Sequence, residues 1–263
     1  MITSKANEYS DVFSLKNRTA FIMGGKGLLG SEITKAISSY DANTIILDIN
    51  EQWDNDFDNI IYKYFDCSNL DNIETALNDI IDEFGCPDVF INCSYPRTDD
   101  WKKSSFKDIS LHSYQKNIDI HLNSYVWLAK LIANHMVTSR KKSSIIQLGS
   151  IYGILGQDLT VYEGTEMKEN MSYSVIKGGI TNLTRQMASV YGQYGIRVNT
   201  ICSGGIRDSN QDATFVDQYS RKVPLGRLAN ASEVASTALF LASDAASYIT
   251  GATITVDGGW TAV

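Results

Sequence analysis

The feature that most constrains this chain is a strand, a glycine turn, a helix and a second strand, all within residues 18–48. The apolar run Thr19–Met23 leads into Gly24-Gly25-Lys26-Gly27-Leu28-Leu29-Gly30, and a helical pattern follows. Glycines in such a turn let the backbone approach a pyrophosphate, which the N–H groups and dipole of the helix N-terminus stabilise. The next apolar run, Thr44–Leu47, ends in Asp48. The unit therefore predicts a dinucleotide site.

Asp48 also indicates which dinucleotide binds. A carboxylate at this place can accept hydrogen bonds from both ribose hydroxyls of NAD, and it would repel the 2′-phosphate of NADP. We therefore expect NAD, with NADP less favoured. The alternative is a purely structural strand–helix–strand unit with an incidental acid.

Strand-like and helix-like patterns alternate along the rest of the chain. Further strands are expected at residues 60–65, 88–91, 144–148, 196–201 and 252–256, and helices at 71–84, 111–136, 171–191, within 204–221 and at 232–242. Such alternation is typical of a parallel, doubly wound α/β sheet with helices on both faces. We expect one Rossmann-type domain over residues 15–263, preceded by a polar extension at 1–14, and an acidic loop at 50–59.

Composition excludes several classes of partner. The net charge is −7, from 23 basic and 30 acidic residues without a basic cluster, which argues against nucleic acid and anionic membranes. No run approaches the roughly 20 apolar residues of a membrane span, and the N-terminus lacks the apolar core of a signal peptide. We therefore expect a cytoplasmic protein. Four cysteines without a C-x-x-C pair or a histidine cluster predict neither disulfides nor a metal site.

A second motif, between Gly149 and Lys177, predicts chemistry. Lys177 follows Tyr173 by one helical turn, so both lie on the same face of the helix. An ammonium close to a phenol lowers the pKa of the tyrosine toward that of a general acid–base. Ser150 follows the strand at 144–148 and would lie at its carboxyl end, where it can donate to the same substrate oxygen. The alternative is that Tyr173 and Lys177 mark a solvated helix face.

Together these motifs resemble the classical short-chain dehydrogenase/reductase family over roughly residues 13–260. The resemblance also rests on Asn92, on Arg197-Val198-Asn199, on Pro224-Leu225-Gly226-Arg227, on Thr250-Gly251-Ala252 and on Val256-Asp257-Gly258-Gly259. It implies a seven-stranded parallel sheet, a homotetramer or homodimer, Tyr173 as the acid–base, and Lys177 and Ser150 as its helpers. The nucleotide-binding residues that it implies are Gly24, Gly27, Leu28, Leu29, Gly30, Asp48, Ile49, Asp66, Cys67, Asn92, Cys93, Tyr173, Lys177, Gly204 and Ile206.

Four departures from the family pattern are informative. Asn92-Cys93-Ser94-Tyr95 replaces the family's Asn-Asn-Ala-Gly, and Leu28 replaces the second glycine of the turn. His121 aligns with the asparagine of the family's proton relay. We expect His121 either to relay protons in its place, because histidine titrates near neutrality, or only to fill space.

The fourth departure is an insertion at residues 157–170, which is expected to cross the substrate side of the pocket. The segments Tyr95-Pro96-Arg97 and Tyr162-Glu163-Gly164-Thr165 resemble those of dehydrogenases of flagellin modification and nonulosonic acid synthesis. The expected substrate is a small molecule, a sugar or amino sugar, with phosphorylated and nucleotide-linked forms included. The residues expected to contact it are Ser150, Tyr95, Arg97, Tyr162 and Arg207. The alternatives are a generic carbonyl or 3-oxoacyl reductase and a non-catalytic NAD-binding sensor or scaffold.

Overall fold

Seven parallel strands form one sheet in a computed structural model that describes residues 11–51 and 58–263. Their spatial order is β3-β2-β1-β4-β5-β6-β7. The strands are β1 (Thr19–Met23), β2 (Asn43–Asp48), β3 (Ile60–Tyr64), β4 (Val89–Asn92), β5 (Ser143–Leu148), β6 (Ile196–Ser203) and β7 (Thr253–Val256). The predicted doubly wound sheet is confirmed. Its strand order reverses between β1 and β4, which is where such sheets bind ligands.

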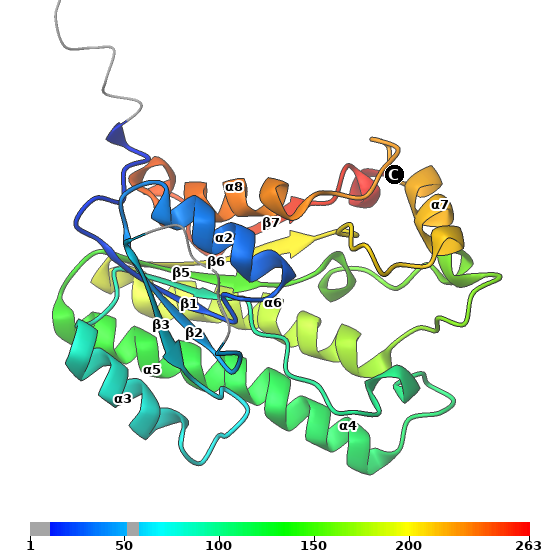
Figure 1. Ribbon diagram of the computed structural model, residues 1–263, viewed down its shortest axis with the longest axis horizontal. Coiled ribbons are helices and arrows are strands. Elements are labelled where there is room, and N and C mark those ends of the chain that lie inside the picture. Colours follow the sequence, from blue (N-terminus) through cyan, green and yellow to red (C-terminus); the bar gives the residue numbers. More distant parts are fainter. Residues whose placement is uncertain (1–10, 52–57) are drawn as a thin grey trace, which may run out of the picture.

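Helices cover both faces of the sheet (Figure 1). They are α2 (Leu28–Ser38), α3 (Ile73–Phe84), α4 (Leu111–Asn117), α5 (Ser124–Ser139), α6 (Met171–Tyr191), α7 (Ala213–Lys222) and α8 (Ala231–Ala242). α2 and α8 pack on one face, and α3, α5 and α6 pack on the other. α7 stands apart from both layers, beyond the carboxyl ends of β5 and β6 (Figure 1).

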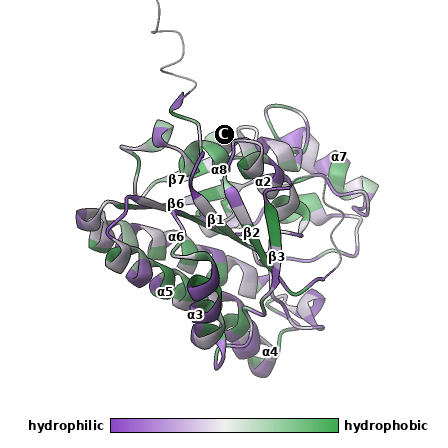
Figure 2. Ribbon diagram, turned by 60° about the vertical axis from the view of Figure 1, so that its left-hand side comes forward, coloured by the Kyte–Doolittle hydropathy of each residue, from purple (hydrophilic) through white to green (hydrophobic). Residues whose placement is uncertain are grey.

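The sheet separates two apolar cores because successive side chains of a strand point to opposite faces. In β1, Ala20 and Ile22 belong to the core under α2 and α8, while Phe21 and Met23 belong to the core under α3, α5 and α6. The apolar sides of the helices face the sheet and their polar sides face outward (Figure 2). A third, smaller cluster joins residues 151–161 to α7 and the C-terminal Trp260.

The structure refines several expected boundaries. The expected helix at 111–136 is α4, a π-helical turn at Ile118–Asn123 and α5, which runs on to Ser139. A π-turn holds one more residue than an α-turn, so it changes which side chains face the sheet, and hydrophobic periodicity does not report it. Of the expected loop at 50–59, residues 52–57 lie outside the described residues, as do residues 1–10 of the expected extension.

The chain joins the folded body earlier than residue 15. The backbone N–H of Ala245 donates to the Val12 carbonyl at 3.1 Å, and the Phe13 ring lies 6.4 Å from that of Phe240 in α8. Within the described part of the chain, no helix has the length and apolar character needed to cross a bilayer.

Candidate active site

The glycine turn between β1 and α2 is packed so closely that side chains there would collide with backbone. A Cβ on Gly30 would lie 2.0 Å from the Gly24 carbonyl oxygen, and a Cβ on Gly24 would lie 2.7 Å from the Cα of Ser94. Gly24 also has a φ of +71°, which other residues rarely adopt. No side chain in the described ranges caps α2 at Gly27. The first helical N–H groups are therefore available to an anion.

Asp48 joins this turn to the end of β2. Its carboxylate accepts hydrogen bonds from the backbone N–H groups of Lys26 and Asn50, each at 3.0 Å. The Lys26 ammonium lies 3.5 Å from the ring centroid of Tyr62 and donates to the Asn50 carbonyl. The structure thus places an acid and a lysine together beside the predicted ribose position.

Ser150, Tyr173 and Lys177 converge where β5 ends and α6 begins. Ser150 is 4% exposed, and it lies close enough to the Tyr173 phenol to lower the pKa of that group. α6 begins after Asn170, whose side-chain oxygen accepts from the Tyr173 N–H at 2.8 Å. Lys177 is 3% exposed, and its Nζ donates to the Leu148 carbonyl at 2.8 Å. The side chains that were predicted to be catalytic are therefore neighbours.

Burial dominates the electrostatics of this group. It raises the pKa of Tyr173, although the nearby Ser150 side chain acts in the opposite direction. It lowers the pKa of Lys177 to about 8. The spacing of Tyr173 and Lys177 predicts that the ammonium lowers the pKa of Tyr173, whereas among the described residues burial is the largest influence and raises it. The ammonium itself is bonded to the Leu148 carbonyl and lies 5.8 Å from the centre of the Tyr173 ring.

Three aromatic rings surround the Lys177 ammonium. Nζ lies 5.3 Å from the ring centroid of Tyr125 and 5.8 Å from those of Tyr95 and Tyr173. Tyr125 is fully buried, and its hydroxyl donates to two carbonyl oxygens at the end of β4, at 3.1 and 2.9 Å. Sequence reasoning missed Tyr125. The available signal was its position one helical turn after His121.

His121 lies in the π-helical turn and is fully buried. Neither ring nitrogen has a hydrogen-bond partner of normal geometry among the described residues. Its ring centroid lies 5.2 Å from that of Tyr95 and 5.5 Å from that of Tyr125. Burial, followed by the charge of Lys177, lowers the pKa of His121 well below its ordinary value, and the Pro96 backbone has a smaller opposite effect. The imidazole is therefore neutral at pH 7, with one donor and one acceptor nitrogen.

Trp101 also belongs to this group, and the sequence analysis does not single it out. It lies in a short 3-10 turn, Trp101–Lys103, within a segment that was expected to be loop. Its ring centroid lies 5.8 Å from that of Tyr95 and 6.4 Å from that of Tyr173, edge to face in both cases. Trp101 and Tyr173 are distant in the chain, so no local sequence pattern marks the contact.

The residues predicted to contact substrate are found in three places. Tyr95 lies beside Tyr173, with the Arg97 guanidinium 5.3 Å from its ring centroid. Tyr162 is half-buried and stacks on Phe215 of α7, with the ring centroids 6.0 Å apart. Arg207 is exposed in the segment after β6. The structure therefore groups Tyr95 and Arg97 with Tyr173, and it places Tyr162 against α7.

The insertion at residues 157–170 connects two walls of the site. On one side the Lys168 ammonium lies 2.7 Å from the Asp108 carboxylate. On the other side the Gln218 amide of α7 donates to the Glu163 carbonyl at 2.8 Å. The insertion thus runs between the segment that follows β4 and α7.

The remaining residues predicted at the nucleotide lie at the carboxyl ends of the strands or at the start of α2. Burial raises the pKa of Cys67 to about 11 and that of Cys93 to about 12, so both thiols are neutral at pH 7. The positions are Leu28 and Leu29 at the start of α2, Ile49 after β2, Asp66 and Cys67 after β3, Asn92 and Cys93 at the end of β4, and Gly204 and Ile206 after β6.

Comparison with known families accounts for this arrangement. A family model described as enoyl-(acyl carrier protein) reductase matches residues 26–261. The chain is 31% identical over 258 residues to post-translational flagellin modification protein A of Campylobacter coli, which covers 94% of this chain and 99% of that protein. The chain belongs to the short-chain dehydrogenase/reductase family. It is an oxidoreductase of that family.

Other members of the short-chain dehydrogenase/reductase family are similar in sequence and structure. Glucose 1-dehydrogenase 2 of Bacillus subtilis is 32% identical over 200 residues, which are 74% of this chain and 72% of that protein. A short-chain dehydrogenase of Leptospira borgpetersenii, solved with bound NAD+, superposes with a TM-score of 0.85 at 30% identity and covers 99% of this chain and 97% of that one.

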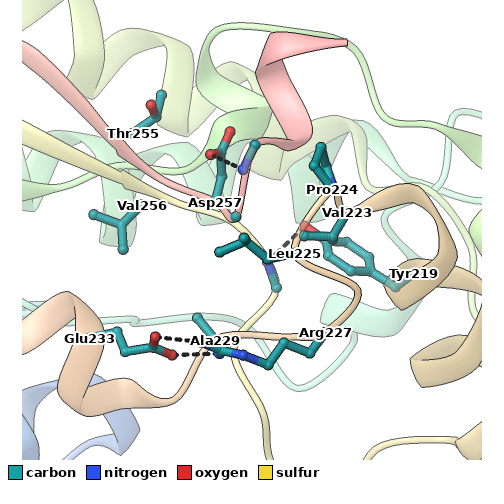
Figure 3. A pocket seen from close by; sticks show the side chains of 13 residues that line it. Tyr219, Val223, Pro224, Leu225, Arg227, Ala229, Glu233, Thr255, Val256 and Asp257 are labelled. Carbon is teal, nitrogen blue, oxygen red and sulfur yellow. Dashed lines mark hydrogen bonds and ion pairs between the residues drawn. The ribbon is translucent and has the colours of Figure 1, made fainter.

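This short-chain dehydrogenase also has a cavity of about 510 Å³ beside β7 (Figure 3). Tyr219, Pro224 and Leu225 line one side of it, and Arg227 pairs with Glu233 through two contacts of 2.7 Å at its rim. Among the described residues that line it, none belongs to the group around Tyr173. The cavity is therefore separate from the group around Tyr173.

Proposed function

We propose that the chain is an NAD-dependent oxidoreductase that interconverts a secondary alcohol and a ketone of a sugar or amino sugar. Tyr173 acts as the general acid–base, because its hydroxyl gives a proton to the substrate oxygen or takes one from it. Ser150 donates a hydrogen bond to the same oxygen, and Lys177 stabilises the phenolate that deprotonation leaves. A bound nicotinamide supplies or accepts the hydride. The convergence of these three side chains beside the Asp48 turn carries the proposal.

The residues at this edge of the sheet fit a dinucleotide. The turn at Gly24 and Gly30 carries no side chain, and α2 presents its first N–H groups there. Asp48 makes one backbone hydrogen bond at each carboxylate oxygen, which leaves lone pairs for ribose hydroxyls. These three features would hold the pyrophosphate and the adenosine ribose.

Cofactor choice is tested at Asp48. Replacing Asp48 with Ala removes the acceptor for the ribose hydroxyls and the charge that repels a 2′-phosphate, and Lys26 stays nearby. We expect NAD to bind about 10-fold or more weakly, since hydrogen bonds to charged groups contribute about 1.5–3 kcal/mol, and NADP to gain relative to NAD. A wild type that already prefers NADP would make this assignment wrong.

The proposed substrate class draws on the site and on two relatives. One relative is named for the post-translational modification of flagellin and another for the dehydrogenation of glucose, and the insertion at residues 157–170 is polar. Arg97 lies next to Tyr95 and can receive a phosphate or carboxylate. Replacing Arg97 with Ala should raise KM for an anionic substrate and leave kcat nearly unchanged. An unaltered KM would remove Arg97 from the site.

We also propose that His121 relays protons between Lys177 and solvent. Support comes from its unpaired ring nitrogens, its neutral state and its position in the π-turn next to the aromatic group. His121→Asn should retain a relay, whereas His121→Leu should lower kcat and shift its pH profile while NAD affinity stays the same. Equal kcat and equal pH profiles in both variants would show that His121 only fills space.

Assembly with further copies through α5 and α6 is part of the proposal. Val175 and Val190 are each 42% exposed on α6, and Trp127 is 43% exposed on α5. Exposed apolar side chains on neighbouring helices favour an interface between protomers. Light scattering of the purified protein distinguishes a dimer or tetramer from a monomer.

The first experiment measures the thermal midpoint with NAD and with NADP, then with NAD and a panel of sugars, sugar phosphates and an acetoacetyl thioester, while following absorbance at 340 nm. A ligand at 100 times its Kd adds about 2.7 kcal/mol of stability to the folded state. We expect stabilisation by NAD and NADH formation with a sugar.

Tyr173→Phe should abolish turnover and keep NAD binding. Turnover of the thioester alone would favour the acyl reductase, and binding of NAD without any turnover would favour the sensor.

A further inference from the structure

The rings of Tyr95 and Trp101 line one side of the Tyr173 side chain. The Tyr95 centroid lies 6.1 Å from that of Tyr173, and the Trp101 centroid lies 6.4 Å from it, with interplanar angles of 77° and 82°. The two rings also contact each other, at 5.8 Å and 83°. The acid–base step itself uses neither ring. They nevertheless form an aromatic wall, Tyr95 and Trp101, next to the reacting hydroxyl.

The aromatic wall is partly exposed to solvent. Tyr95 is 42% exposed and Trp101 is half-buried, whereas Tyr125, in contact with the same group, is fully buried. Binding sites for small molecules are typically lined by aromatic side chains with a few polar groups that fix orientation. A partly open aromatic surface beside a reactive hydroxyl is therefore available to the apolar face of a ligand.

Positive charge borders the wall. Arg97 lies above the Tyr95 ring, and it forms no ion pair with any carboxylate of the described residues. Residues 97–107 carry four basic and two acidic side chains, in a chain whose net charge is −7. The planar guanidinium matches a phosphate or carboxylate in two parallel hydrogen bonds. The border of the wall therefore favours an anionic group.

Hydrogen bonds fix the wall to the helix that carries Tyr173. The Asn170 amide donates to the Trp101 carbonyl at 3.3 Å, and the Met171 N–H donates to the Ser104 carbonyl at 2.8 Å. Asn170 also caps α6 through the Tyr173 N–H. The wall and the reacting hydroxyl thus share one support, which reduces the ordering cost of binding.

We infer that Tyr95 and Trp101 form a subsite for the apolar face of a sugar ring that carries an anionic group, which Arg97 receives. A pyranose with equatorial hydroxyls presents axial C–H groups on its faces and polar groups around its edge. Its face packs on the wall and its edge meets the polar insertion. The inference rests on the proposed function, because the ring carbon beside the Tyr173 hydroxyl is the one oxidised or reduced.

The test measures ligand binding to a variant that is expected not to convert the substrate. Tyr173→Phe saturated with NAD is titrated calorimetrically with glucose 6-phosphate, glucuronate and, as an open-chain match, glucitol 6-phosphate. Adding Trp101→Leu should weaken binding of the two ring sugars about tenfold and leave binding of glucitol 6-phosphate nearly unchanged. Only a closed sugar ring has an apolar face that packs on the Trp101 ring. Tyr95→Leu should do the same. Trp101→Phe should keep most of the affinity.

Tyr248→Leu provides a matched control, because Tyr248 is an exposed aromatic residue outside the wall, and its affinities should equal those of the parent. NAD affinity is measured in every variant, so that a folding defect is recognised. The subsite is overturned if Trp101→Leu weakens binding of the ring sugars and of glucitol 6-phosphate equally, or weakens neither. In that case turnover of a substrate by the wild type would still support the proposed oxidoreductase. The subsite is also overturned if neither ring sugar binds to Tyr173→Phe. The proposed function is then tested separately by turnover of the wild type on the wider panel of sugars, sugar phosphates and the thioester.

Discussion

The two halves of the site are built in different ways. In the glycine turn and the acid that follows it, most contacts join residues close in the sequence: Asp48 bonds to Lys26, 22 positions away, and Gly24 packs on Gly30 as well as on the more distant Ser94. On the substrate side, Lys168 reaches Asp108, 60 positions away, and Gln218 reaches Glu163, 55 positions away. The core of the nucleotide half is thus one local unit, whereas the substrate half depends on contacts between distant segments.

The halves also differ in how tightly they are packed. An added Cβ at Gly30 would meet a carbonyl oxygen at 2.0 Å, whereas one at Gly156, just before the insertion, meets nothing within 4 Å. The nucleotide turn tolerates no change of shape, because its neighbours are backbone. The chain has room for an added methyl group where it enters the insertion, at Gly156.

The largest effect is expected for Gly30→Ala. The new methyl group collides with the Gly24 carbonyl, so the turn must move away from the start of α2. Overpacking of this kind costs about 2–4 kcal/mol of unfolding free energy. We expect loss of measurable NAD binding as well, observed by titration calorimetry alongside chemical denaturation.

Gly156→Ala is the matched control, because it makes the same chemical change where space is open. Its unfolding free energy and NAD affinity should equal those of wild type. If the two variants behave alike, the tight packing of the nucleotide turn has no energetic consequence and the contrast between the halves fails.

Lys177 lies where the two halves of the site meet. Its burial makes the unfolding free energy of the protein depend on pH. Its pKa in the folded state, about 8, is below the ordinary value of 10.5, so folding disfavours the charged form. As pH rises through 8, the folded state loses this proton before the unfolded state does, and stability rises. Relative to Lys177→Met, wild type should gain about 2.5 kcal/mol of unfolding free energy between pH 7 and pH 10.

This difference is measured by denaturant titration of both proteins at each pH, which cancels the cysteines and tyrosines that titrate in both. NADH formation should be absent in Lys177→Met at every pH. A constant difference between the two proteins across this range would show that the ammonium is better stabilised than its burial indicates, for example by the three rings around it.

The contrast between the halves explains what the sequence could predict. The sheet, the glycine turn and Asp48 follow from local patterns of apolar periodicity and turn residues. Ser150, Tyr173 and Lys177 follow because the strand and helix that carry them are themselves regular. Trp101 could not be found in this way, since its importance lies in rings that meet across distant segments, and Tyr125 is indicated only by its spacing from His121. Burial raises the pKa of Tyr173 among the described residues, and a sequence spacing does not reveal burial.

The smallest effect is expected in the insertion. Tyr162 stacks on Phe215, and replacing it with Leu removes an aromatic pair that contributes about 0.5–1.5 kcal/mol. Hydrogen exchange should become faster for amides within residues 157–170, and exchange in β1 and β2 should stay as it is, because the insertion opens locally. Leu159→Ala, in the same 3-10 turn but 55% exposed, is the control and should change neither. Faster exchange in β1 or β2 of Tyr162→Leu would mean that the two halves of the site are coupled and open together.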